Sequence, residues 1–145
     1  MADDDHRRVT LERLETGVYR ATNPQGAQLT FGSKDESGFS PVELLLAAIG
    51  GCSAVDVDVV TGRRAEPERF EVVVEADKVR DEGGGNVLRD LHMTFHVTFP
   101  EGEDGDKARE LLPRAVRTSH DRTCTVSRTI ESGAPVAVHI ADERS

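Results

Sequence analysis

Residues 40–62 read SPVELLLAAIGGCSAVDVDVVTG and contain the strongest local signal in the chain. Ser40 is a typical N-cap, Pro41 suits the first helical position, and Glu43 completes a capping box. These signals predict a helix from Pro41 to about Thr61. Apolar residues surround the axis of this helix, as in a helix that is buried on all sides. One layer of a short chain covers such a helix poorly, so a second copy is expected to complete the core.

The segments that flank this helix have the patterns of β-strands. Residues 11–31 contain two short strand-like runs on either side of a turn at 23–26. Residues 70–79 predict another strand, and a glycine-rich turn at 82–86 follows it. Apolar and polar residues then alternate strictly over residues 91–99, which is typical of an antiparallel sheet with one face on the core.

The last third of the chain predicts two helices and a strand. The first helix covers residues 106–119, and Pro113 inside it favours a kink or an earlier break. The second begins at Cys124, with Thr123 or Asp121 as its cap. Residues 136–140 predict a closing strand.

This order of elements predicts one α+β domain over residues 1–145, with residues 1–8 flexible. A net charge of −9, from 27 acids and 18 bases, argues against nucleic acid and anionic membranes as partners. No stretch is expected to cross a membrane. The acidic N-terminus lacks the apolar segment of a secretory signal. We therefore expect a cytoplasmic protein, in which Cys52 and Cys124 are free thiols or a redox pair.

The two cysteines occupy different settings. Cys124 lies at the predicted start of a helix, where free amide groups and the helix dipole lower the pKa of a thiol. A cysteine that merely packs in the core fits that position equally well. Cys52 lies in the apolar helix and, taken alone, resembles a core cysteine. Asp56, one turn further on, would disfavour a Cys52 thiolate if both side chains pointed the same way.

Two segments of the chain resemble the signatures of the OsmC/Ohr family. They are residues 40–56, SPVELLLAAIGGCSAVD, and residues 123–127, TCTVS. The resemblance implies a swapped homodimer in which antiparallel sheets wrap around a long buried central helix from each subunit. It also implies that Cys52 is peroxidatic and attacks a peroxide as a thiolate. The resulting sulfenic acid condenses with Cys124, the resolving cysteine, and an external dithiol reduces the disulfide without a bound cofactor.

The chain departs from the family pattern at one position. Peroxidase members carry a glutamate directly after the motif proline, where it helps to hold a catalytic arginine, and this chain has Val42 there. The neighbouring Glu43 is a candidate for that role, although a capping box explains it equally. The arginine is expected from the N-terminal strands, with Arg20 the first candidate and Arg13 the next.

Three functional hypotheses follow. The leading one is a peroxidase of the oxidative stress response that uses Cys52 and Cys124 to reduce organic hydroperoxides or hydrogen peroxide. The second is a non-catalytic dimer that binds a small apolar ligand or senses redox state, which Val42 favours. The third is a structural relative whose cysteines lie too far apart to bridge. His92 and His96 are expected to be surface residues, since four residues of strand separate them too widely to share a metal.

Overall fold

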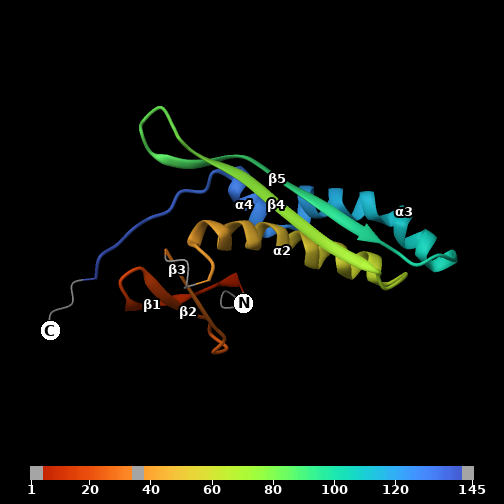
Figure 1. Ribbon diagram of the computed structural model, residues 1–145, viewed down its shortest axis with the longest axis horizontal. Coiled ribbons are helices and arrows are strands. Elements are labelled where there is room, and N and C mark those ends of the chain that lie inside the picture. Colours follow the sequence, from red (N-terminus) through yellow and green to blue (C-terminus); the bar gives the residue numbers. More distant parts are fainter. Residues whose placement is uncertain (1–4, 34–37, 142–145) are drawn as a thin grey trace. The chain divides into compact units, whose positions relative to one another are not determined.

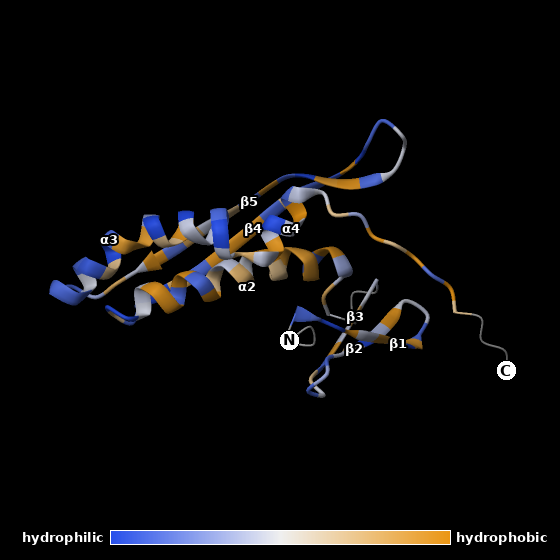
Figure 2. Cartoon of the chain, turned by 180° about the vertical axis from the view of Figure 1, so that it is seen from behind, coloured by the Kyte–Doolittle hydropathy of each residue, from blue (hydrophilic) through white to orange (hydrophobic). Residues whose placement is uncertain are grey.

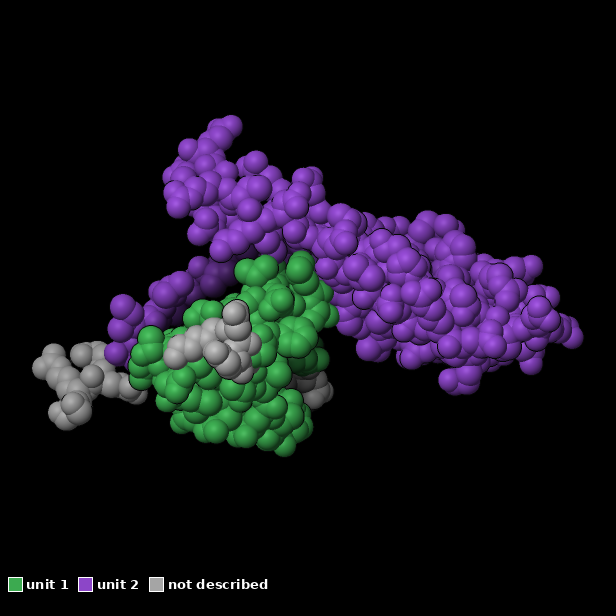
Figure 3. All heavy atoms as spheres, in the orientation of Figure 1, with its two compact units in different colours: residues 1–48 green, residues 49–145 purple. Residues whose placement is uncertain are grey.

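The computed structural model describes residues 5–33 and 38–141, which belong to two compact units, residues 1–48 and residues 49–145 (Figure 3). The predicted α+β class is confirmed. In chain order the elements are β1 (Thr10–Glu15), β2 (Val18–Thr22), β3 (Gln28–Gly32), α2 (Pro41–Gly62), β4 (Arg69–Arg80), β5 (Asn86–Thr98), α3 (Glu103–Thr118), the π-helical turn η2 (Ser119–Thr123) and α4 (Thr125–Ser132) (Figure 1).

The first unit contains a three-stranded antiparallel sheet in the order β1-β2-β3. The predicted turn at 23–26 joins β2 to β3, and the Gly26 amide donates to the Asn23 carbonyl at 3.0 Å. The prediction of two strands was wrong, because a second tight turn divides the first run into β1 and β2. That turn depends on Gly17, whose φ of +77° favours glycine.

Helix α2 begins with the predicted capping box. The Ser40 amide donates to Glu43 Oε1 at 2.9 Å, and the Glu43 amide donates to Ser40 Oγ at 3.2 Å. Two backbone amides at the start of the helix are therefore satisfied by side chains of the same turn. The observed bounds, Pro41–Gly62, agree with the predicted helix to within one residue.

Only one stripe of α2 is buried in a single chain. Its fully or nearly fully buried side chains recur every fourth residue, at Ile49, Ser53, Val57 and Thr61. The opposite face is open, with Val55 63% and Val59 54% exposed. The prediction of burial on all sides is therefore wrong for one chain, in which Val55 and Val59 lack cover.

Helix α2 also corrects the expectation about membrane spans. It is 22 residues long, with a mean hydropathy of 1.7 over 18 residues, and by length and composition it could cross a membrane. The core helix of a soluble protein passes the same test, and 28% of that window is buried in the chain.

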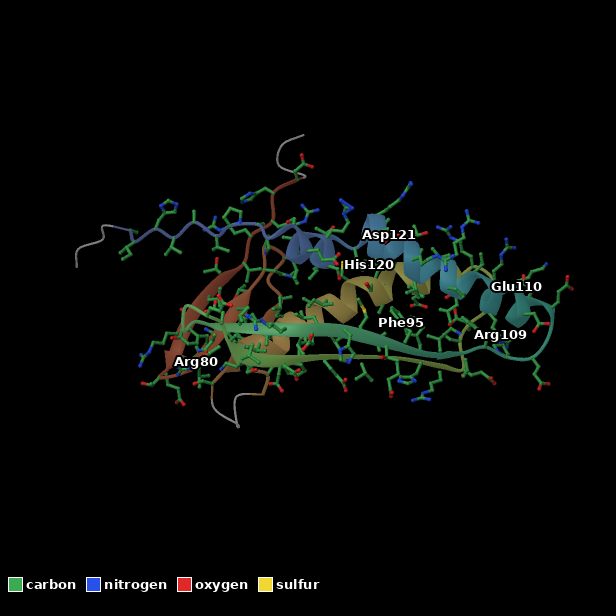
Figure 4. All side chains as sticks on the ribbon, turned by 90° about the horizontal axis from the view of Figure 1, so that it is seen from above. Arg80, Phe95, Arg109, Glu110, His120 and Asp121 are labelled. Carbon is green, nitrogen blue, oxygen red and sulfur yellow. The ribbon has the colours of Figure 1, made fainter. Side chains whose placement is uncertain are left out.

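The second unit is built on the antiparallel hairpin of β4 and β5. The part of α2 from Ile49 onward and α3 lie on one face of this hairpin (Figures 1 and 4). The predicted alternation is confirmed from Met93 to Phe99, where Met93, Phe95, Val97 and Phe99 are more buried than the residues between them, but Leu91 is 37% exposed. A Cβ at Gly50 would lie 2.7 Å from Val74 Cγ2, so the glycine lets α2 approach β4 closely.

Helices α3 and α4 differ from their predicted bounds. Helix α3 begins at Glu103, three residues early, and continues through Pro113 without the predicted break. A proline inside a helix costs about 3 kcal/mol, yet α3 continues past it, with Ala108 and Ala115 buried on either side of Pro113 in sequence. Helix α4 begins at Thr125, so its N-cap is Cys124 and not Thr123 or Asp121.

The predicted closing strand over residues 136–140 does not form in the chain. This segment is extended but unpaired, and it is mostly hydrophobic, with His139 its one hydrophilic residue (Figure 2). Its apolar side chains are fully open to solvent, and Ile140 is 95% exposed. A strand needs the edge of another strand, and the described residues of one chain pair none with this segment.

Candidate functional site

The structure brings the two cysteines together where α2 meets the start of α4. The Cys52 and Cys124 side chains are close enough for each to shift the pKa of the other, and both thiols are free. Cys52 is partly exposed, whereas Cys124 is completely buried. The reading in which packed cysteines lie too far apart to interact is therefore not supported by this arrangement.

The N-terminal turn of α4 serves both sulfur atoms. Cys124 caps the helix, and its Sγ accepts the Ser127 amide at 3.5 Å. The backbone amides of Thr125 and Val126 lie against Cys52. The first amides of a helix have no partner within the helix and carry part of its dipole. One helix start thus offers stabilising donors to a negative charge on either sulfur.

These surroundings lower the pKa of Cys124 below its ordinary value of 9.0. Burial alone would raise this pKa, but the hydroxyls of Ser127 and Ser53, the Ser127 amide and the Cys52 thiol together outweigh burial. The predicted direction for Cys124 agrees with this result, and the residue acts from the N-cap and not from the first turn.

The pKa of Cys52 moves in the opposite direction. Burial raises it above 9.0, and the Val126 amide only partly offsets that effect. The bond to Cys124 and the charge on Cys124 raise it further. Because the two thiols are linked, a single negative charge shared by the pair resides preferentially on Cys124.

A group of hydroxyls connects this pair to Asp56, one helical turn beyond Cys52. The Ser53 hydroxyl lies against Cys124, and Ser119 Oγ bonds to Ser53 Oγ at 3.3 Å. Ser119 Oγ and Thr123 Oγ1 each donate to Asp56 Oδ2 at 2.9 Å. Helix α2 and the turn η2 are therefore held together through one carboxylate.

His120 lies on the turn η2 with Ser119 and Thr123. Its ring nitrogens bond to Asp121 Oδ1 at 3.0 Å and to Glu131 Oε1 at 3.2 Å (Figure 4 labels His120 and Asp121). The bond to Asp121 and the charge of Glu131 raise the pKa of His120 above 6.5. Among the described residues, no group of three or more His, Cys, Asp or Glu could hold a metal ion.

A cavity of about 330 Å³ lies beside the hydroxyls of Ser53 and Ser127, and neither cysteine is among its lining residues. Its walls are mostly apolar, and the buried hydroxyls of Ser53 and Ser127, both in contact with Cys124, form part of the lining. Ser127 Oγ has no partner that meets ordinary hydrogen-bond geometry within the described residues. The lining residues are Ile49, Ser53, Val74, Leu91, His92, Met93, Phe95, Val116, His120, Ser127, Ile130 and Glu131.

The two other predicted site residues belong to the first unit. Glu43 makes the capping-box bond to the Ser40 amide, as that interpretation predicts. Arg20 lies on β2 and pairs with Glu12 at 2.6 Å, with its side chain 38% exposed. The thiols belong to the second unit, so the catalytic roles predicted for Glu43 and Arg20 stay predictions.

The residues that sequence reasoning missed are the hydroxyls around Cys124. Ser127 follows Cys124 by three positions, which is the spacing between an N-cap and the amide that it accepts, so this contact left a local signal. Ser53 and Ser119 left none, because 66 residues separate them in sequence.

Comparison with known proteins places this arrangement among related folds. The sequence model of the family described as OsmC-like protein matches residues 33–139. An uncharacterised protein of Mycobacterium tuberculosis is 29% identical over 134 residues, which cover 91% of this chain and 94% of the relative. A hypothetical protein from Aquifex aeolicus has a TM-score of 0.69 at 24% identity, and the match covers 88% of each chain.

A second solved structure adds a named relative with the same fold. The organic hydroperoxide resistance protein OhrB of Bacillus subtilis has a TM-score of 0.51 at 17% identity. The match covers 86% of this chain and 90% of that protein. At these identities the two solved structures show a shared fold.

Proposed function

Because the chain belongs to the OsmC-like protein family, we propose that it is a cytoplasmic thiol-dependent peroxidase that reduces organic hydroperoxides or hydrogen peroxide. The observation that carries this proposal is the position of Cys52 and Cys124, in contact with each other at the amide-rich start of α4. The name of the Bacillus subtilis relative, an organic hydroperoxide resistance protein, supports the same class of substrate.

In the proposed reaction Cys52 is the attacking sulfur, since it is the more accessible of the two. The negative charge of the pair reaches Cys52 when its proton moves across the hydrogen bond to Cys124. The Cys52 thiolate attacks the terminal peroxide oxygen, the O–O bond breaks, and the leaving oxygen takes a proton and departs as alcohol or water. Cys52 is then a sulfenic acid.

Resolution returns the site to its starting state without a bound cofactor. Cys124 attacks the sulfenic sulfur of Cys52, an S–S bond forms, and the hydroxyl group leaves as water. An external dithiol then reduces the disulfide by thiol–disulfide exchange and is itself oxidised to a disulfide.

The apolar cavity favours an organic hydroperoxide with an apolar body as the substrate, rather than hydrogen peroxide. A volume of about 330 Å³ is at the lower end for small-molecule sites. Filling it with Val116→Phe should lower kcat/KM for cumene hydroperoxide and leave kcat/KM for hydrogen peroxide unchanged. An equal loss with both peroxides would contradict this choice of substrate.

A homodimer is part of the proposal. The open face of α2, with Val55 and Val59 exposed, and the unpaired segment at 136–140 are the surfaces that a second copy would cover. Val55→Asp should shift the sedimentation coefficient from that of a dimer to that of a monomer. A parent chain that sediments as a monomer would refute this part.

A second candidate function is favoured by the same cavity. An apolar pocket beside thiols also suits a non-catalytic protein that binds a small apolar ligand or senses redox state, and Val42 replaces the glutamate expected in peroxidases.

Steady-state assays separate the two candidates. The test is consumption of cumene hydroperoxide with dithiothreitol by the parent, Cys52→Ser and Cys124→Ser. The peroxidase predicts turnover by the parent and none by Cys52→Ser. Absence of turnover by a parent that still binds apolar probes would favour the second candidate.

A further inference from the structure

The hydroxyl groups beside Cys124 form a continuous path from the buried sulfur to a carboxylate. The path runs from Cys124 Sγ to Ser53 Oγ, then 3.3 Å to Ser119 Oγ, then 2.9 Å to Asp56 Oδ2. Each hydroxyl can donate one hydrogen bond and accept another. The path is therefore able to pass a proton in either direction.

The interior of this path is almost completely buried. Cys124 is 0%, Ser119 1% and Ser53 2% exposed. Only Asp56 is partly exposed, and it lines a surface pocket of about 230 Å³. Ser53 also forms part of the wall of the larger cavity, and Asp56 is the member of the path that combines an ionisable group with partial exposure.

The proposed reaction requires such an exit. Cys124 receives a proton when Cys52 becomes the attacking thiolate, and it must lose that proton before it can attack the sulfenic acid. The thiolate and not the thiol is the nucleophile.

We propose that Asp56 accepts the proton of Cys124 through Ser53 and Ser119 while the disulfide forms. The proton moves from Cys124 Sγ to Ser53 Oγ, the Ser53 proton moves to Ser119 Oγ, and the Ser119 proton moves to Asp56 Oδ2. The S–O bond of the sulfenic acid breaks as the S–S bond forms. The departing hydroxide takes a proton from solvent, and Asp56 returns its proton to solvent.

The hydrogen bonds of Ser119 to Asp56 and to Ser53 correspond to the states before and after the proton transfer. Its single hydroxyl proton points to Asp56 before the transfer and to Ser53 afterwards, and both partners lie within hydrogen-bonding distance. After the transfer, Ser53 donates to the Cys124 thiolate, which agrees with its effect on that thiol. Thr123 also donates to Asp56 but stands outside the path.

The other ionisable side chains nearby have hydrogen-bond partners of their own. His120 of η2 is bonded to Asp121 and Glu131, and His120 and Glu131 line the larger cavity that Ser53 also lines. The Arg128 guanidinium of α4 donates to the Asp121 carbonyl at 2.8 Å. Among the residues that line the 230 Å³ pocket, Asp56 is the one with an acidic or basic side chain.

The test follows the two steps of one turnover separately, since the relay rests on the proposed function. Protein is mixed with one equivalent of cumene hydroperoxide at a pH well below the pKa of Cys124. Quenched samples are scored by mass spectrometry for dimedone-trapped Cys52 sulfenic acid and for the disulfide. The variants are Asp56→Asn, which keeps the shape and the accepting oxygen, and Ser119→Ala, which cuts the path.

Two matched controls distinguish loss of the proton path from a general structural effect of the substitutions. Thr123→Val removes the other hydrogen bond to Asp56 without cutting the path, and Asp58→Asn removes an exposed carboxylate from the same helix. Sulfenic acid should form at the parent's rate in every variant. Disulfide formation should slow about 100-fold in Asp56→Asn and Ser119→Ala, as on loss of a positioned proton acceptor. The deficit should shrink as the pH rises.

Two results would overturn the relay: disulfide formation at the parent's rate in Asp56→Asn, or an equal slowing in Thr123→Val. Asp56→Asn keeps an oxygen that accepts the hydrogen bonds from Ser119 and Thr123. It therefore tests the relay even if Ser119→Ala is unstable. A parent that forms no sulfenic acid refutes the proposed function itself, and the relay with it. Normal sulfenic acid formation with unaffected resolution refutes the relay alone.

Discussion

Replacing Ser127 by alanine tests the claim that the start of α4 makes Cys124 acidic. The Ser127 hydroxyl is buried, has no hydrogen-bond partner of ordinary geometry within the described residues, and lowers the pKa of Cys124, whose thiolate would be its acceptor. A hydrogen bond to a charged group contributes about 1.5–3 kcal/mol. Since one pKa unit corresponds to about 1.4 kcal/mol, Ser127→Ala should raise the pKa of Cys124 by about one to two units.

The same substitution should affect stability in a pH-dependent way. The folded pKa of Cys124 lies below 9.0, so its thiolate contributes stability that is fully present above 9.0 and is lost as the pH falls through the folded pKa. Ser127→Ala should therefore destabilise the protein at alkaline pH. At acidic pH it should be neutral or slightly stabilising, because it removes a buried hydroxyl that lacks a partner.

The assay is a pH titration of thiolate absorbance in a Cys52→Ser background, where Cys124 is the one remaining thiol. Ser132→Ala is the matched control, since that hydroxyl lies on the same helix, is exposed and donates to the Thr129 carbonyl at 2.7 Å. The reasoning is refuted if Ser127→Ala leaves the midpoint unchanged, or if Ser132→Ala moves it equally.

Three further predictions concern stability and charge. Gly105→Ala places a Cβ 1.7 Å from the Pro100 carbonyl oxygen, so urea unfolding should show a loss of about 3 kcal/mol; an unchanged midpoint would contradict this packing. Ser40→Ala removes the N-cap of α2 and should cost about 1 kcal/mol in the same measurement, and no loss would mean that the cap is not formed in solution. Glu131→Gln should lower the pKa of His120, which Asp121 and Glu131 hold above 6.5. The stability that protonated His120 contributes is present below pH 6.5 and is lost as the pH rises through the folded pKa. An NMR titration of the His120 ring measures this pKa, and an unchanged midpoint in Glu131→Gln would refute the pairing.

The parts of the fold that could be predicted from the sequence depend on local signals. The capping residues Ser40 and Glu43 mark the start of α2, and the strict alternation over residues 91–99 marks β5. The start of α4 was misplaced by one residue because cysteine is not a usual N-cap. The segment at 136–140 has the pattern of a strand, but pairing depends on an edge that a pattern does not supply.

The candidate site divides in the same way. Cys52 and Cys124 could be identified because they are the two cysteines of the chain and resemble family signatures. The hydroxyl path could not, since Ser119 meets Asp56 across 63 positions and Ser53 across 66. Serines in a sequence carry no mark of such a contact, so the path becomes visible only after α2 and η2 are packed together.

The most direct test of the central claim is a count of free thiols before and after one equivalent of cumene hydroperoxide. The parent, Cys52→Ser and Cys124→Ser are compared after full reduction. The proposed peroxidase predicts rapid loss of both thiols in the parent, no reaction in Cys52→Ser, and a sulfenic acid that persists in Cys124→Ser. Persistence of both thiols in the parent through excess peroxide would contradict it.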